Sequence, residues 1–248
     1  MIRRILPLIL CALWLPLATA GEITVSAAAS LSNAFREIAT AFEQERPEHG
    51  VQLNFAGSGA LLQQMAHGAP VDIFASADQA TMNQARDLGL LDNASRRDFV
   101  SNRLVLITPL SSPPLQALDD LLQPAWQRIA VSNPDSVPVG RYSREVLAGI
   151  GLWDALQDRF IQTQNVRHSL DYVARGEVDA GFVYATDAAL MADRVSVRLT
   201  VPTPTPVLYP IAITALGADN PASSDFIDYL FSPASQAILQ RYGFGAVQ

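Results

Sequence analysis

Short apolar runs alternate with amphipathic segments along most of this chain. After the N-terminal twenty residues, the first short β-type run is Ile23–Val25. Apolar residues then recur at helical spacing at Leu31, Ala34, Phe35, Ile38 and Phe42. Residues three and four positions apart share one face of a helix, so this pattern predicts a helix that packs one face on a core. Pro47 and Gly50 interrupt the pattern, and Val51–Phe55 has the character of a second strand.

The same alternation continues to the end of the sequence. Further strands are predicted at Val71–Ala75, Arg103–Thr108, Arg128–Val131, Ala180–Tyr184, Ser196–Val201 and Ile211–Leu216. Helices are predicted at Leu61–Ala66, Gln79–Leu88, Tyr142–Ile150, Val166–Ala174, Ala222–Phe231 and Pro233–Arg241. Strands that alternate with helices favour parallel sheets with helical crossovers, so the fold class is α/β.

The strand–helix pattern restarts near residue 128, which indicates two lobes. We expect the chain to cross between them twice, near Ser101–Arg103 and near Thr205–Tyr209. Residues 21–101 and 206–248 then form one lobe, and residues 102–205 form the other. Each lobe is expected to hold a mixed, mostly parallel sheet flanked by helices. Open α/β sheets bind ligands beyond the carboxyl ends of their strands, so a cleft between the lobes is the expected ligand site.

Residues 1–20 have the three parts of a cleavable secretory signal. Arg3 and Arg4 are its charged start, Ile5–Leu17 is its apolar centre, and Ala18-Thr19-Ala20 provides a small-residue cleavage site. The only cysteine, Cys11, follows bulky residues, so no lipoprotein anchor is expected. The processed chain is therefore expected in the periplasm, without a disulfide and without insertion into the membrane.

The charge balance restricts the partners of this chain. The formal net charge is −7, and all 17 basic residues are arginines. An acidic surface repels nucleic acids and anionic membranes, so neither is an expected partner. The absence of lysine excludes Schiff-base chemistry and a P-loop lysine. An anionic ligand has to be held by local dipoles rather than by the overall field.

Two serine-bearing loops carry the candidate chemistry. Ser30 lies in A-A-A-S-L (Ala27–Leu31) and Ser58 in A-G-S-G-A-L (Ala56–Leu61), each between a predicted strand and a predicted helix. A helix N-terminus presents unpaired N–H groups and a partial positive charge, and a serine there adds a hydroxyl donor. The alternative role of both serines is to cap their helices.

Signals for catalysis or for a metal site are weak. The three histidines, His49, His67 and His168, have neither metal-binding spacing nor an acidic partner in a known motif. Gly57-Ser58-Gly59 does not match the nucleophile elbow of hydrolases. A serine hydrolase that uses Ser58 stays open as an alternative, but no catalytic residue, cofactor or metal ion is expected.

In combination, several segments resemble the periplasmic molybdate-binding proteins of bacterial ABC importers. They are A-A-A-S-L (Ala27–Leu31), G-A-P-V-D-I-F-A-S-A-D (Gly68–Asp78), V-P-V-G (Val137–Gly140), V-Y-A-T-D-A (Val183–Ala188) and R-Y-G-F (Arg241–Phe244). The resemblance implies a type II periplasmic binding protein with two hinge crossings. It further implies that a tetrahedral dianion is bound by the hydroxyls of Ser30, Ser58 and Tyr184 and by the backbone N–H groups of Val139 and Val166.

The implied function is to capture molybdate, and with it tungstate, and to deliver the anion to the permease of an ABC importer. The protein is expected to act as a monomer and to catalyse no reaction. A site whose protein groups only donate hydrogen bonds suits this function, because molybdate, tungstate and sulfate are fully deprotonated at neutral pH and only accept them. Phosphate carries a proton that needs an acceptor. The alternatives are a sulfate or thiosulfate receptor, the hydrolase that uses Ser58, and the ligand-sensing domain of a transcription regulator.

Overall fold

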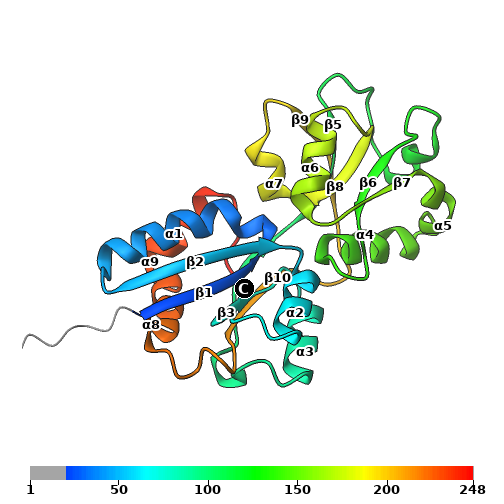
Figure 1. The fold of residues 1–248 in the computed structure, drawn as a ribbon. Helices are drawn as coiled ribbons and strands as arrows, with labels where there is room; N and C mark the ends of the chain where they lie inside the picture. The colour runs from blue at the N-terminus through cyan, green and yellow to red at the C-terminus, as the bar shows by residue number, and fades with distance from the viewer. Residues whose placement is uncertain (1–20, 248) are drawn as a thin grey trace, which may run out of the picture.

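Two five-stranded sheets form the centres of two lobes in the computed structural model, which describes residues 21–247 (Figure 1). The predicted secretory signal lies outside these residues. Lobe 1 contains the sheet with strand order β2-β1-β3-β10-β4, and lobe 2 contains the sheet with strand order β7-β6-β8-β5-β9. The α/β fold with one mixed sheet in each lobe is therefore confirmed.

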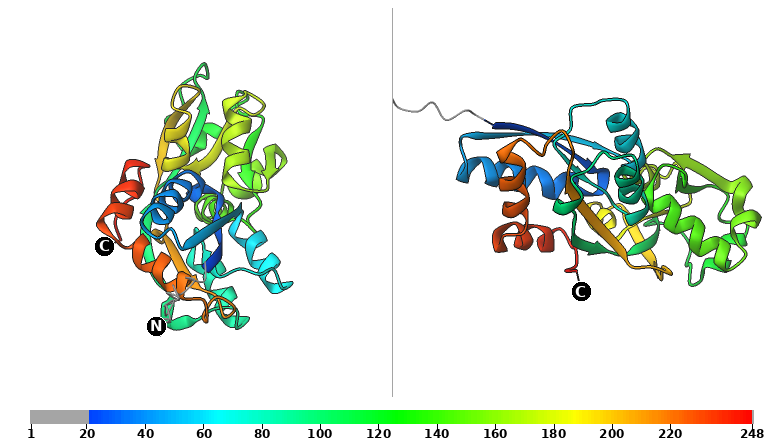
Figure 2. Two further views of the ribbon diagram at one scale, coloured as in Figure 1. Left: turned by 60° about the vertical axis from the view of Figure 1, so that its left-hand side comes forward. Right: turned by 90° about the horizontal axis from the view of Figure 1, so that it is seen from below.

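Lobe 1 is built from the first and last parts of the described chain. Its strands are β1 (Gly21–Ala28), β2 (His49–Ala56), β3 (Ile73–Ala75), β4 (Arg97–Asn102) and β10 (Val207–Ile213). Its helices are α1 (Ser32–Glu45), α2 (Ser58–Ala66), α3 (Gln79–Asp87), α8 (Pro221–Leu230) and α9 (Pro233–Arg241), with 3-10 turns η1 (Ala29–Leu31) and η2 (Asn93–Ser95). Figure 2 shows α8 and α9 packed on lobe 1, away from the helices of lobe 2.

Lobe 2 is built from the middle of the chain. Its strands are β5 (Leu104–Pro109), β6 (Ile129–Ser132), β7 (Phe160–Thr163), β8 (Ala180–Tyr184) and β9 (Val195–Val201). Its helices are α4 (Pro138–Gly149), α5 (Trp153–Leu156), α6 (Val166–Ala174) and α7 (Ala185–Leu190), with 3-10 turns η3 (Leu118–Leu122) and η4 (Gln157–Arg159). The chain enters this lobe at Arg103 and leaves it through residues 202–206, and these two connections form the hinge.

The sheets are less parallel than the sequence pattern predicts. Each sheet has two parallel and two antiparallel pairings. A single strand makes both antiparallel pairings in each sheet, β10 in lobe 1 and β5 in lobe 2. Each of these strands enters its lobe from the hinge, so it has to run away from the hinge. The other strands run toward the hinge and bring their carboxyl ends to the face between the lobes.

Each predicted strand and helix occurs in the structure, and helix α6, strand β8 and helix α9 have the predicted bounds. Helices α2 and α4 begin earlier than predicted, at Ser58 and Pro138. The edge strands β4 and β7 and the short helices α5 and α7 were not predicted. The bounds of the predicted strand Ile211–Leu216 are wrong, because β10 spans Val207–Ile213. Pro210 interrupts the apolar pattern there, and the pairing of β10 with β4 shifts between Tyr209 and Pro210, which is where a sheet tolerates proline.

A half-buried aspartate precedes the central strand of each sheet. Asp72, just before β3, accepts a hydrogen bond from the backbone N–H of Thr24 at 2.7 Å. Asp179, just before β8, accepts from the N–H groups of Gln127 at 2.9 Å and Arg128 at 2.8 Å. These two carboxylates therefore satisfy backbone donors of neighbouring strands. No helix of residues 21–247 has the length and apolar character needed to cross a membrane.

Asp72→Ala is expected to destabilise lobe 1. The carboxylate of Asp72 accepts from Thr24 and from the side-chain amide of Asn220, and hydrogen bonds to charged groups contribute about 1.5–3 kcal/mol each. We expect the free energy of unfolding in urea to fall by about that amount. Asp87→Ala is the control, because Asp87 is exposed and pairs only with its neighbour Arg86. Equal stability of the two variants would contradict the structural role of Asp72.

Candidate functional site

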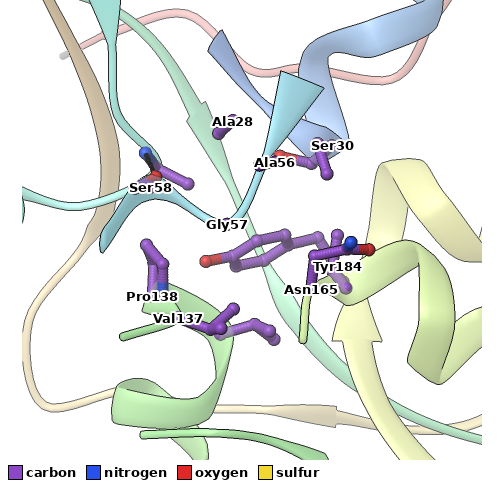
Figure 3. Close-up of a pocket in the computed structure, with 13 residues that line it drawn as sticks. Ala28, Ser30, Ala56, Gly57, Ser58, Val137, Pro138, Asn165 and Tyr184 are labelled. Atoms are coloured by element: carbon purple, nitrogen blue, oxygen red, sulfur yellow. Dashed lines mark hydrogen bonds between the residues drawn. The ribbon is translucent and has the colours of Figure 1, made fainter. Parts of the chain in front are cut away.

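A small cavity lies between the two lobes and is lined entirely by uncharged residues (Figure 3). Thirteen of the described residues line it, seven from lobe 1 and six from lobe 2. They include all five residues predicted from the sequence: Ser30, Ser58, Val139, Val166 and Tyr184. The volume of the cavity is about 10 Å³, close to the room that one water-sized group needs. Cavities for drug-sized ligands range from about 300 to 1,000 Å³, so this one suits a small ion.

Four helix N-termini converge on this cavity. Ser30 lies in η1, which leads directly into α1, and Ser58 is the first residue of α2. Val139 follows Pro138 in the first turn of α4, and Val166 is the first residue of α6. N–H groups of a first helical turn have no partner within the helix and carry partial positive charge. Four sets of such donors from two lobes therefore face the same small space.

Neither predicted serine caps its helix. The cap of α2 is Gly57, and neither α1 nor α2 has a side-chain cap hydrogen bond. The Ser58 hydroxyl oxygen instead accepts a hydrogen bond from the backbone N–H of Ala77 at 3.1 Å. The hydroxyl of Ser30 lies 3.0 Å from that of Tyr209. The capping alternative is wrong for both residues, because their side chains are committed to contacts around the cavity.

Tyr184 contributes a third hydroxyl, which has no partner in the protein. This tyrosine ends β8 and is 1% exposed, and its hydroxyl oxygen makes no hydrogen bond. Figure 3 shows its ring lying across the cavity, with Ser30 to one side and Ser58 to the other. Burial raises the pKa of Tyr184 well above 10, so the hydroxyl keeps its proton. A buried O–H without an acceptor carries a desolvation cost that an anionic ligand in the cavity removes.

One pair of charged groups lies near this site but outside the cavity lining. Asp187, in the first turn of α7, is fully buried, and one of its carboxylate oxygens lies 2.6 Å from Nε of Arg167. Burial raises the pKa of Asp187 to about 6, although Arg167 opposes this shift. The carboxylate is therefore ionised at neutral pH and balances the arginine. The pair adds little net charge near the cavity.

The two lobes contact each other on both flanks of the cavity. On the flank next to α3, Arg141 of α4 binds the carboxylate of Asp78 at 2.7 Å and also contacts Thr81. On the flank next to α1, Arg167 of α6 donates to the side chain of Asn33 at 3.0 Å and to the carbonyl of Ser30 at 3.2 Å. These two arginines, which we call the interlobe arginines, hold the lobes together around the site.

Glycines allow the backbones of the lobes to approach closely beside Ser58. The N–H of Gly59 donates to the carbonyl of Ser136 in lobe 2 at 2.9 Å. A Cβ atom on Gly59 would lie 2.4 Å from that carbonyl oxygen, and one on Gly57 would lie 2.9 Å from the carbonyl oxygen of Gln164. Any side chain at position 59 would therefore hold the lobes apart.

Sequence reasoning missed several residues of this site. Asn165 lines the cavity and caps α6, accepting from the N–H groups of Arg167 and His168. Its position just before a predicted helix was an available signal, because asparagine is a preferred N-cap. Arg141 and Arg167 gave no signal, since their partners lie in the other lobe and far away in sequence.

The histidines and aspartates do not build an alternative site. No group of three or more His, Cys, Asp or Glu side chains within residues 21–247 is arranged to hold a metal ion. His49 bonds to Asp225, and His67 contacts the carbonyl of Gln63 at the end of α2. The hydroxyl of Ser58 contacts the N–H of Ala77 rather than an imidazole. Nothing in this geometry activates Ser58 as a nucleophile.

Comparisons with known proteins agree with this geometry. The family model for bacterial extracellular solute-binding proteins matches residues 23–245. The molybdate-binding protein ModA of Escherichia coli is 39% identical over 92% of this chain and 90% of its own length. The structure of the substrate-binding domain of a molybdenum ABC transporter from Clostridium difficile is 33% identical, with a TM-score of 0.69, covering 92% of this chain and 99% of that one.

A second solved structure, the periplasmic molybdate-binding protein of Azotobacter vinelandii, superposes with a TM-score of 0.78 at 25% identity. The superposition covers 91% of this chain and all of the other. The matched regions extend over both lobes and therefore include every element that borders the cavity. This chain thus belongs to the bacterial extracellular solute-binding protein family, in the group of the molybdate-binding proteins ModA.

Proposed function

We propose that this protein captures molybdate, and tungstate with it, in the cavity between the lobes and delivers it to the membrane permease of an ABC importer. It acts in the periplasm as a monomer, with neither a catalytic step nor a cofactor. The names of its relatives and the composition of the cavity both support this function.

The hydroxyl of Tyr184 is the observation that carries the proposal. It is a buried, protonated donor without an acceptor, and it shares its cavity with the serine hydroxyls of Ser30 and Ser58. The N–H groups of Val139 and Val166 add donors from lobe 2. A site of this kind needs a ligand that only accepts hydrogen bonds. A tetrahedral oxyanion with two negative charges and no proton meets this requirement.

The same set of donors favours the binding of fully deprotonated oxyanions over oxyanions that carry a proton. Hydrogen phosphate has a proton to donate, and no carboxylate lines the cavity to accept it. Its binding therefore leaves two donors facing each other, at a cost of about 1–3 kcal/mol. Sulfate has the same charge and the same hydrogen-bonding character as molybdate. It is smaller, so the closed lobes contact it less well and reject it by size alone.

Closure of the lobes completes the site. Ser30 and Ser58 belong to lobe 1, whereas Val139, Val166 and Tyr184 belong to lobe 2, so the full set of donors exists only when the lobes meet. The interlobe arginines and the contact between Gly59 and Ser136 form in that same arrangement. The ligand therefore shifts an equilibrium between open and closed lobes by hinge motion.

Molybdate is expected to stabilise the protein against heat. A ligand at a hundredfold excess over its Kd adds about 2.7 kcal/mol to the free energy of unfolding, which raises the midpoint by roughly 5–10 °C for a chain of this size. Tungstate should give a similar shift, and phosphate should give none. Differential scanning fluorimetry with equal concentrations of molybdate, tungstate, sulfate and phosphate checks this. A shift with sulfate as large as that with molybdate would mean that the assigned oxyanion is wrong.

Ser58→Ala is expected to weaken molybdate binding while the fold is kept. The variant loses one hydrogen bond to a charged ligand, which corresponds to about 1.5–3 kcal/mol, or roughly a 10- to 150-fold higher Kd. Isothermal titration calorimetry measures the change. Ser223→Ala is the matched control, because Ser223 is a buried helical serine of α8 whose hydroxyl has no partner. If both variants bind like wild type, Ser58 does not bind the ligand.

Gly59→Ala is expected to prevent closure without disturbing lobe 1. Alanine is favoured over glycine within a helix by about 1 kcal/mol, so α2 should be at least as stable as before. The added Cβ collides with the Ser136 carbonyl only when the lobes meet. Small-angle X-ray scattering should show wild type contracting on addition of molybdate and the variant not contracting. Gly149→Ala, with nothing within 4 Å of the new Cβ, is the control. Normal contraction of Gly59→Ala would contradict this closed arrangement.

A further inference from the structure

A chain of hydrogen bonds runs from the hinge to the hydroxyl of Ser30. The side-chain amide of Asn102 donates to the hydroxyl oxygen of Tyr209 at 3.3 Å, and that hydroxyl lies 3.0 Å from Oγ of Ser30. Asn102 is the last residue of β4 before the chain crosses to lobe 2, and Tyr209 lies in β10 just after the chain returns. Tyr209 is fully buried, so water does not complete its hydrogen bonds.

The orientation of the Asn102 amide is fixed by a backbone contact. The N–H of Arg103 donates to Oδ1 of Asn102 at 2.9 Å, and only the oxygen of an amide can accept that bond. The nitrogen Nδ2, which only donates, therefore faces the hydroxyls of Thr186 at 2.9 Å and Tyr209 at 3.3 Å. The oxygen of Tyr209 thus accepts a hydrogen bond from Asn102.

The direction of the next bond follows from the single proton of Tyr209. Burial raises the pKa of Tyr209 well above 10, so the hydroxyl is protonated at neutral pH. Its polar neighbours are Nδ2 of Asn102, which cannot accept, and Oγ of Ser30, which can. If Ser30 donated to Tyr209 instead, the tyrosine proton would be buried without an acceptor. Tyr209 therefore donates to Ser30, and the proton of Ser30 is left for the cavity.

We propose that Tyr209 is a specificity-determining residue: because Asn102 donates to it and it donates to Ser30, it does not take up the proton of Ser30, so Ser30 has to donate to the ligand and the cavity rejects oxyanions that carry a proton. The proposal rests on the proposed function of the cavity. A protonated oxyanion needs one acceptor, and Ser30 could accept its proton without leaving its own proton unpaired only if Tyr209 accepted from Ser30. Ser58 is held in the same role by the backbone N–H of Ala77, which no side-chain substitution removes. Ser30 is therefore the serine whose role can be tested.

Tyr209→Phe separates the role of the Tyr209 hydroxyl from that of its ring. It removes the hydroxyl and keeps the aromatic ring, which packs edge-on against the ring of Tyr184 with centroids 5.8 Å apart. The Kd values of wild type and variant for molybdate and for inorganic phosphate are measured by calorimetry at pH 7, with competition against molybdate where phosphate binds weakly. We expect the ratio of the phosphate Kd to the molybdate Kd to stay at its wild-type value, because phenylalanine offers the proton of Ser30 no acceptor either.

Tyr229→Phe is the matched control for loss of a tyrosine hydroxyl. Tyr229 lies in α8, and its hydroxyl contacts only Glu45, at 3.4 Å, away from the cavity. This control should leave both Kd values unchanged. A lower ratio in Tyr209→Phe would mean that Ser30 accepts from phosphate without the hydroxyl of Tyr209, which would overturn the proposal.

Asn102→Asp is the direct test, because it reverses the direction of the chain of hydrogen bonds. The new carboxylate accepts the proton of Tyr209, so the tyrosine oxygen can accept from Ser30, whose own oxygen then becomes available as an acceptor for a protonated ligand. The phosphate-to-molybdate ratio should fall about tenfold in this variant, since one hydrogen bond changes its direction. The added negative charge weakens the binding of both anions, so it does not by itself lower the ratio. In the Tyr209→Phe background, the same substitution should leave the ratio unchanged, because the connection to Ser30 is already broken.

The outcomes separate this proposal from the proposed function. If wild type does not bind molybdate, both are overturned. If wild type binds molybdate and Asn102→Asp keeps the wild-type ratio, only the role of Tyr209 is overturned. Thermal unfolding without ligand checks that each variant folds. Should Tyr209→Phe fail to fold, the ratio in Asn102→Asp alone decides: a lower ratio supports the role of Tyr209, and an unchanged ratio overturns it.

Discussion

A buried N–H or O–H group requires an acceptor, and the cavity between the lobes has donors without acceptors. Tyr184 shows this most directly, because its hydroxyl is buried, protonated and without a partner. The first turns of four helices add N–H groups that have no acceptor within their own helix. A dianion bound in the cavity supplies acceptors for all of these donors. Because no charged side chain lines the cavity, the binding free energy depends on how well these dipoles are aimed, not on a net charge.

The topology of the sheets explains why so many helix N-termini meet at one place. Every strand except β5 and β10 runs toward the hinge, so the loops that follow those strands open at the face between the lobes. Helices α2 and α6 begin directly beyond such strands. The two strands that run the other way carry the chain across the hinge. One of them brings Tyr209 to the back of the cavity, where it contacts Ser30.

Much of the fold was predictable from the sequence, because apolar periodicity is a local property. Helix α6 has its predicted bounds, since Asn165 caps its start and Gly176 adopts the positive φ that follows its end. The edge strand β7 was missed because its two middle residues, Ile161 and Gln162, are both exposed and leave no apolar alternation. The five predicted site residues line one cavity, and the resemblance to a family indicated them better than periodicity did. Arg141 and Arg167 were not predictable, because their partners are fixed only by how the lobes meet. Tyr209 was not predictable either, because it meets Ser30, far away in sequence, only in the folded lobe 1.

The interlobe arginines occupy particular positions in their helices. Arg141 comes two residues after Val139 and Arg167 directly follows Val166, so each lies in the same first turn as an N–H group that faces the cavity. A rigid tilt of α4 or α6 therefore moves both the cation and its neighbouring amide together. Binding of the ion and closure of the lobes are therefore coupled in one movement of the helix. A transporter that breaks either interlobe arginine contact also moves an amide away from the ion, so release of the ion needs no separate step.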